Sequence, residues 1–441
     1  MAVNYADRRP TTDDAEADTQ CAKGYTPAPI GEPASYWLAT AAWPPAAPAD
    51  LPATADVAVI GGGLLGAATA YWLARAGAAV VLLEAGALAG GATGRNGGFV
   101  VAGTAAPYPE AIERYGHATA RAVWALTLES RVLLRQTLAE EAIDCDYREP
   151  GLLHLALGDA QLAGLARTVA ALRADDFAVA LLDRQQVQEL VGTPLGHEIA
   201  GGLFAPEDGL VHSARLVHGL AGAAGRHGAR LREATAVTRL ETDGGGVRVR
   251  MARGDLRAGA AVVAANAWSD ELIPALAGLV TPVRGQVLCY APVAPVFRCG
   301  MGAAVTPTGE YWQQAPDGSI ILGGCRAAVP GSEVGVRESV PTAEIQSAIE
   351  QIFPRLFPSL GGLRVARRWA GLMAFTPDEL PIADRAPGLP GVWVVGGFCG
   401  HGMPFGMRLG QLLAEAALGG AKPAGLEPFR FDRPTLANRS T

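Results

Sequence analysis

Lysine is almost absent from this chain, whose 441 residues include only Lys23 and Lys422. A lysine that forms a Schiff base lies in a folded core beside its substrate, and neither of these residues, one near each end of the sequence, belongs to a core-like segment. Pyridoxal chemistry is therefore excluded. Basic functions have to come from arginine, from histidine or from a bound cofactor.

Three other absences narrow the class of protein. With a net charge of −7, the chain has no basic footprint for nucleic acid. No apolar run is long enough to span a membrane, and the acidic, polar residues 1–18 are unlike a signal peptide, so we expect a cytoplasmic protein without a membrane partner. The six cysteines form no CxxC pair, which argues against a disulfide framework and a zinc site, and no metal is expected.

Residues 56–84 carry the complete pattern of a dinucleotide-binding unit. An apolar strand enters a glycine-rich loop, and an alanine-rich helix and a second strand follow. In the loop, Gly61 permits the tight turn, Gly63 lets the backbone approach a pyrophosphate at the helix N-terminus, and Gly66 allows close helix–strand packing. Glu84 ends the second strand, where a carboxylate accepts hydrogen bonds from a ribose. This order favours a dinucleotide site over a purely structural glycine turn.

A second glycine-rich loop, residues 90–98, follows too soon for the crossover helix of a nicotinamide-type domain and suits FAD, whose flavin half extends beyond the first nucleotide. Its segment Gly-Ala-Thr-Gly-Arg-Asn-Gly-Gly resembles the GASGRNGG element of the FAD-dependent amine oxidoreductases of the D-amino-acid oxidase superfamily, especially the γ-glutamylputrescine oxidase group. Further segments resemble that superfamily in the same order: 35–37, 142–147, 266–268, 282–286 and 396–402.

The resemblance implies an α/β fold of the glutathione-reductase/D-amino-acid-oxidase type, in which a Rossmann-like FAD-binding domain is interleaved with an α+β substrate domain built on a mixed sheet. We expect the FAD-binding domain over 51–138, 209–280 and 367–430, and the substrate domain over 139–208 and 281–366. The proline-rich residues 1–50 predict an extended arm. Apolar spacing predicts one long amphipathic helix over 110–141.

The implied chemistry is oxidation of the C–N bond of a small amine, by hydride transfer to flavin N5, to an imine that hydrolyses. Oxygen or another acceptor then reoxidises the flavin. We expect FAD to be held non-covalently, because the cysteine that attaches flavin in sarcosine oxidases corresponds to a position near Gly371. The oligomeric state stays open.

Four residues are the catalytic candidates. Arg95 and His401 lie in glycine-rich loops and are expected to stabilise negative charge on the reduced flavin, unless Arg95 is a salt-bridged surface residue and His401 only shapes its turn. Tyr311 and Arg326 flank a hairpin that the family places over the flavin face, although Tyr311, like Trp312, also suits a sheet core. Phe99, Met373 and Phe375 are candidates for the pocket wall.

Cofactor binding is expected to involve both glycine loops, an adenine-side strand and the 396–402 loop. The residues that the resemblance implies are Gly61, Gly63, Leu64, Leu65, Gly66, Glu84, Ala85, Thr93, Gly94, Arg95, Asn96, Gly97, Gly98, Val237, Ala265, Trp268, Gly397, Gly400, His401, Gly402 and Met403.

Departures from the family pattern bear on the substrate. An arginine and a lysine that hold a substrate carboxylate in relatives correspond here to Met373 and Pro404. We therefore expect an acylated diamine or similar amine rather than a simple α-amino acid. Three alternatives stay open: a glycine, sarcosine or D-amino-acid oxidase with Arg326 as carboxylate anchor, a flavoprotein dehydrogenase or tailoring enzyme that does not act on amines, and a nicotinamide-dependent dehydrogenase. The oxygen-activating lysine of some relatives corresponds to a position near the apolar Ile321, so oxidase and dehydrogenase both remain possible.

Overall fold

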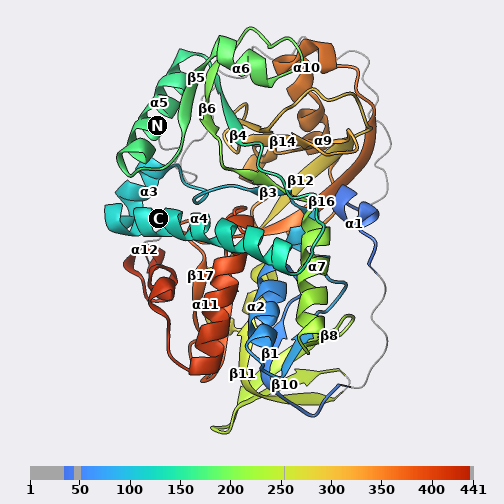
Figure 1. The fold of residues 1–441 in the computed structure, drawn as a ribbon, viewed down its shortest axis with the longest axis vertical. Coiled ribbons are helices and arrows are strands. Elements are labelled where there is room, and N and C mark those ends of the chain that lie inside the picture. Colours follow the sequence, from blue (N-terminus) through green and yellow to red (C-terminus); the bar gives the residue numbers. More distant parts are fainter. Residues whose placement is uncertain (1–33, 44–50, 253, 438–441) are drawn as a thin grey trace.

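Two eight-stranded sheets, one above the other in Figure 1, organise the molecule. The structure is a computed structural model that describes residues 34–43, 51–252 and 254–437. Their α-helices are α1 (Tyr36–Thr40), α2 (Leu64–Arg75), α3 (Tyr108–Tyr115), α4 (His117–Glu140), α5 (Asp159–Ala174), α6 (Arg184–Leu190), α7 (Ser213–Arg226), α8 (Ser269–Leu272), α9 (Ala343–Glu350), α10 (Ile352–Leu356), α11 (Gly406–Gly419) and α12 (Pro434–Ala437). None of these helices has the length and apolar character needed to cross a bilayer.

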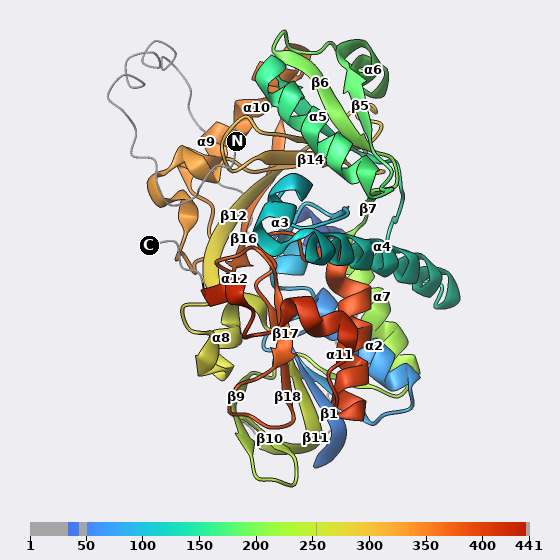
Figure 2. The same cartoon turned by 90° about the vertical axis from the view of Figure 1, so that its left-hand side faces the viewer.

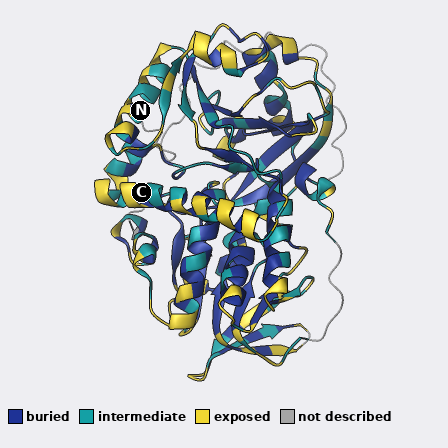
Figure 3. Cartoon of the chain, viewed as in Figure 1, coloured by how far each residue is buried: buried dark blue, intermediate teal, exposed yellow. Residues whose placement is uncertain are grey.

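The first sheet has the order β17-β18-β11-β1-β2-β8, in which β18, β11, β1, β2 and β8 are parallel and the edge strand β17 is antiparallel. Strands β9 and β10 form an antiparallel branch from β11. Its central strands are apolar on both faces because each face is covered (Figure 3). Helices α2, α7 and α11 lie together on one face (Figure 2). The strands are β1 (Thr54–Ile60), β2 (Val80–Leu83), β8 (Arg230–Arg232), β9 (Val237–Thr242), β10 (Val247–Met251), β11 (Asp255–Val263), β17 (Ile382–Arg385) and β18 (Val392–Gly396).

Small residues set how closely α11 approaches α2. A β-carbon added at Gly410 would lie 2.8 Å from the β-carbon of Ala68, and one added at Gly406 would lie 2.4 Å from a methyl group of Leu64. The start of α11 therefore rests directly on the start of α2. This contact brings the loop that precedes α11 next to the first glycine loop.

The second sheet is mixed, with the order β16-β12-β15-β14-β13-β4-β6-β5. On the face that carries α9 and α10, Trp312 packs against Phe353 and Phe357 and is fully buried. Because side chains alternate along a strand, Tyr311 lies on the opposite face. The strands are β4 (Leu152–Leu157), β5 (Ala180–Asp183), β6 (Ile199–Ala205), β12 (Thr281–Tyr290), β13 (Gly300–Ala303), β14 (Glu310–Gln314), β15 (Ile320–Gly323) and β16 (Val365–Phe375), and β3 (Phe99–Val100) pairs separately with β7 (Gly209–Leu210).

Three local predictions differ from the structure. The helix predicted over 110–141 is two helices, α3 and α4, because Gly116 between them has a φ of 80° that breaks the helical path. Strand β16 pairs with β12 in the second sheet, whereas residues from 367 onward were expected in the FAD-binding domain. Most of the predicted extended arm lies outside the described residues, but Tyr36–Thr40 forms helix α1 because Ser35 caps it.

Protonation of His212, the N-cap of α7, is expected to destabilise the fold. Its Nδ1 accepts a hydrogen bond from the Arg215 amide at 3.3 Å, and burial lowers its pKa from 6.5 to about 4. The unfolded chain therefore takes up a proton near pH 6.5, before the folded chain does, so stability is lost as the pH falls from 6.5 towards 4. We expect the parent to lose about 2 kcal/mol more between pH 7 and pH 5 than His212→Asn, which keeps a capping acceptor but does not titrate. Urea unfolding at the two pH values measures this, and an equal loss in both proteins would assign the acid sensitivity to other groups.

Candidate active site

A continuous cavity of about 1890 Å³ is lined by residues of both sheets. Small-molecule sites usually measure roughly 300–1,000 Å³, so this cavity has room for a dinucleotide together with a second molecule. The predicted catalytic and cofactor-binding residues all line it except four glycines, Gly66, Gly94, Gly98 and Gly397. These four are places where the backbone is too crowded for a side chain.

The first glycine loop connects β1 to α2 and opens onto this cavity. Gly61 has a φ of 111°, and a β-carbon there would lie 2.5 Å from the Ala264 carbonyl oxygen. A β-carbon at Gly66 would lie 1.8 Å from the Gly61 oxygen, so only glycine fits under the turn. The first backbone amides of α2 have no acceptor within the helix and, together with the helix dipole, favour an anion such as a pyrophosphate.

Glu84 ends β2 beside this loop. One oxygen of its carboxylate accepts a hydrogen bond from the Gly62 amide at 2.6 Å, and the other accepts one from the Gly86 amide at 2.7 Å. The carboxylate is therefore fixed at the edge of the cavity, and Ala85 and Val237 line the cavity beside it. Glu84 both shapes the loop and presents acceptor lone pairs to a ligand.

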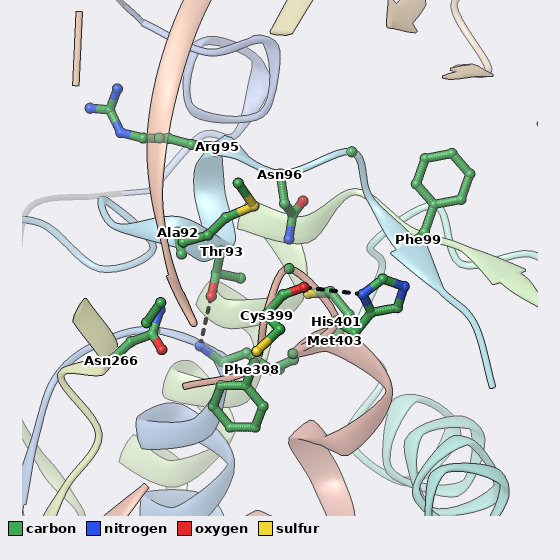
Figure 4. A pocket seen from close by; sticks show the side chains of 18 of the residues that line it. Ala92, Thr93, Arg95, Asn96, Phe99, Asn266, Phe398, Cys399, His401 and Met403 are labelled. Atoms are coloured by element: carbon green, nitrogen blue, oxygen red, sulfur yellow. Dashed lines mark hydrogen bonds between the residues drawn. The ribbon is translucent and has the colours of Figure 1, made fainter. Parts of the chain in front are cut away.

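The second glycine loop lies across the start of α2. The Thr93 hydroxyl accepts a hydrogen bond from the Leu64 amide at 3.1 Å (Figure 4). The Trp37 indole of α1 donates to the Asn96 carbonyl oxygen at 2.7 Å, and the Gln313 amide of β14 donates to the Gly97 and Gly98 carbonyl oxygens. Gln313 was not predicted as a site residue, because its role depends on the contact between β14 and a distant loop.

Arg95 points away from the centre of the site, on the far side of the loop from His401 (Figure 4). Its guanidinium donates to the carbonyl oxygens of Gly90, at 3.0 Å, and Ala370, at 3.1 Å, and it forms no ion pair within the described residues. Burial lowers its pKa. A β-carbon at Gly371 would lie 2.7 Å from the β-carbon of Arg95, so a cysteine at that position would collide with this loop. Arg95 thus contributes a positive charge near the loop rather than a surface salt bridge.

The loop before α11 carries His401. The Gly397 amide donates to the Asn266 side chain at 3.1 Å, which fixes the loop to the segment containing Ala265 and Trp268. The His401 amide donates to the Phe398 carbonyl oxygen at 2.8 Å, whereas the Gly400 and Gly402 amides have no acceptor within the described residues. The loop therefore offers the Gly400 and Gly402 amides to a ligand, whereas the His401 amide is already engaged.

The His401 imidazole lies at the cavity wall. Burial lowers its pKa below 6.5, so the ring is neutral at neutral pH. Its Nδ1 lies 3.3 Å from the Cys399 carbonyl oxygen (Figure 4). A carbonyl oxygen only accepts, so we assign the proton to Nδ1, which leaves a lone pair on Nε2. A neutral ring with a free lone pair suits proton acceptance better than stabilisation of negative charge.

Aromatic and aliphatic side chains form the opposite wall. Tyr311 stands edge to face with Phe99, with their ring centres 5.8 Å apart, and burial raises its pKa to about 12. The Arg326 guanidinium is buried, lies 5.2 Å from the centre of the Phe375 ring and donates to the Ser332 carbonyl oxygen at 3.3 Å. Met373 lines the cavity beside them. The structure thus places two of the predicted catalytic candidates, Tyr311 and Arg326, on the same wall of the cavity.

His154 of β4 is a cavity residue that the sequence analysis missed. The signal was present, because it is the single polar residue in the run Leu152–Leu157. Whether this histidine faces a cavity depends on which strands lie beside β4.

Comparison with known proteins now places this site in a family. Residues 56–416 match the family model described as FAD dependent oxidoreductase. The chain belongs to the FAD-dependent oxidoreductase family. It is 29% identical over 381 residues to the γ-glutamylputrescine oxidoreductase of Escherichia coli (strain K12), covering 84% of this chain and 85% of the relative. It is 28% identical to the glycine oxidase of Geobacillus kaustophilus (strain HTA426), covering 86% and 97%.

The fold comparison agrees with the family. The crystal structure of glycine oxidase from Geobacillus kaustophilus superimposes with a TM-score of 0.75 at 25% identity, covering 87% of this chain and 99% of that one. The predicted family, α/β fold class and FAD cofactor are confirmed. The cradle fits FAD, because two glycine loops, the N-terminus of α2 and the Glu84 carboxylate line one cavity of this FAD-dependent oxidoreductase.

Proposed function

We propose that this FAD-dependent oxidoreductase oxidises the C–N bond of a small amine whose second polar group lies away from the reacting carbon. The observation that carries the proposal is the pair Met373 and Pro404, which line the cavity at both positions where the family resemblance implies a carboxylate anchor. When bound, FAD supplies the two-electron acceptor. The names of relatives such as γ-glutamylputrescine oxidoreductase support an amine substrate.

The chain's own residues orient the amine and keep water away from it. The cavity has an aromatic wall formed by Phe99, Tyr311 and Phe375, which excludes water around the reacting carbon. The amine has to be neutral when it is oxidised, and the Nε2 lone pair of His401 is placed to accept its proton. Either oxygen or another acceptor closes the cycle.

A second candidate is an amino-acid oxidase, and one observation favours it. Arg326 is a buried guanidinium that lines the cavity beside Tyr311, where it would match a substrate carboxylate bidentately. Its position against Phe375 and the Ser332 carbonyl oxygen counts against this role, because the cation already has partners. The first candidate therefore stands as the conclusion.

The two candidates predict opposite substrate orders. We expect N-acetylputrescine to reduce the bound flavin at least about tenfold faster than glycine, sarcosine or D-alanine, because the amino acids bury a carboxylate without a dedicated anchor at a cost of more than ~1.4 kcal/mol. Anaerobic stopped-flow measurement of flavin bleaching gives the rates. Rapid bleaching by glycine or D-alanine would identify Arg326 as a carboxylate anchor and reverse the conclusion.

A further inference from the structure

A glycine lies in the cavity wall between two ring-bearing residues of the second sheet. Gly302 of β13 pairs with His154 of β4 on one side and with Tyr311 of β14 on the other. Residues paired across neighbouring strands lie on the same face of a sheet, so His154, Gly302 and Tyr311 all face the cavity. Gly302 has no side chain, so the imidazole of His154 can extend over it at the cavity wall.

The imidazole of His154 leans over Gly302. A β-carbon added at Gly302 would lie 3.1 Å from His154 Nδ1, so the ring nitrogen is already above the glycine. A ligand group that enters the cavity beside Gly302 therefore meets the ring nitrogens of His154.

His154 has no hydrogen-bond partner within the described residues, although it lies between buried strand residues. Burial lowers its pKa, so the ring is neutral and offers one N–H donor and one lone pair. The half-buried ring faces the cavity with both nitrogens unpaired in the part of the chain that the structure describes, so a ligand that supplies both an acceptor and a donor can pair with them. An amide does so, whereas a carboxylate or an ammonium offers only one of the two.

The cavity beyond His154 favours an uncharged substrate tail. Its walls include Leu165 of α5, Leu203 of β6 and Trp124 of α4. The charged groups Arg131, Asp208 and Glu207 form one ion-pair cluster, since Arg131 contacts Asp208 at 3.1 Å and Glu207 at 2.8 Å. The apolar part of the wall is therefore what an uncharged tail would contact.

We propose that His154 is a specificity-determining residue that hydrogen-bonds the amide group of an acylated amine substrate at the cavity wall beside Gly302. The inference rests on the proposed function, because it takes the amine to be oxidised on the cofactor side of Tyr311. It assigns the distal end of the substrate to β4 and β13, whereas the reacting end lies beside the cofactor loops.

The test compares two amines of equal chain length, N-acetylputrescine, which carries the amide, and heptylamine, which does not. In His154→Leu we expect the substrate concentration for half-maximal flavin reduction to rise about tenfold for N-acetylputrescine, the value of one hydrogen bond, with the limiting rate changed less than about twofold. Heptylamine should be unaffected or bind better. His154→Gln, which keeps a donor and an acceptor, should restore part of the difference, and His197→Leu, at an exposed position, is the matched control.

A second variant keeps the imidazole but changes its position. Gly302→Ala should also weaken N-acetylputrescine selectively, because the added methyl group would lie 3.1 Å from His154 Nδ1 and displace the ring. Equal losses for both amines in these variants, or no loss for N-acetylputrescine, would overturn the proposal. If no amine reduces the flavin of the parent enzyme, the proposed function fails, and the two failures are thereby distinguished. If His154→Leu does not fold, His154→Gln and Gly302→Ala decide the question.

Discussion

Replacing Glu84 by arginine is expected to yield a folded protein that has lost most of its FAD. The parent carboxylate accepts the Gly62 and Gly86 amides, and an arginine side chain has no acceptor atom. Two unpaired amides cost ~1–3 kcal/mol each, and the ribose loses its acceptor as well, so the affinity for FAD should fall by about a hundredfold or more. Titrating the apoprotein with FAD and measuring bound flavin by absorbance gives this change.

Two companion variants sharpen this experiment. Glu84→Gln keeps one acceptor oxygen and should lose less affinity than Glu84→Arg. Glu113→Arg makes the same charge reversal at an exposed position of α3 that does not line the cavity, and should bind FAD as the parent does. Full flavin occupancy in a folded Glu84→Arg protein would remove Glu84 from the binding set. Loss of folding in Glu84→Arg would leave the decision to Glu84→Gln.

Replacing His401 by alanine is expected to slow reduction of the bound flavin by roughly a hundredfold. Loss of a positioned proton acceptor typically slows a reaction by roughly 10²–10⁴-fold, and we expect the lower end of that range here. The imidazole is neutral because burial lowers its pKa, so its contribution in the parent should be lost as the pH falls through that lowered pKa and the Nε2 lone pair takes up a proton. The acid limb of the rate profile should therefore disappear in His401→Ala.

The measurement is stopped-flow reduction, normalised to bound flavin and repeated from pH 5 to pH 8. A residue that only shapes the turn would lower FAD occupancy or melting temperature and leave the normalised rate unchanged. His197→Ala, at an exposed histidine, serves as the control. A rate within about twofold of the parent would remove His401 from the catalytic candidates. Arg95 would then be the remaining candidate for charge stabilisation, acting across the loop backbone.

The parts of the site that follow from local backbone chemistry were predictable. The loops at Gly61 and Thr93 depend on positive φ values, close backbone approach and a helix start, all of which leave marks in neighbouring residues. The direction of the Arg95 side chain could not be predicted from neighbouring residues, because the Ala370 carbonyl oxygen that accepts its hydrogen bond belongs to a strand far along the chain. The position of His154 at the cavity wall beside Gly302 depends on the pairing of β13 with β4. Strand order between distant segments is the information that one sequence lacks.

Helix α1 has a bearing on how the enzyme retains its cofactor. Ser35 donates a hydrogen bond to the Gly94 carbonyl oxygen and Trp37 donates one to that of Asn96, so this short helix forms the underside of the second glycine loop. No strand of either sheet includes it. A chain that began at β1 would keep both sheets while the FAD-binding loop lost its support. Folding of the body and retention of the cofactor thus depend on different segments of the chain.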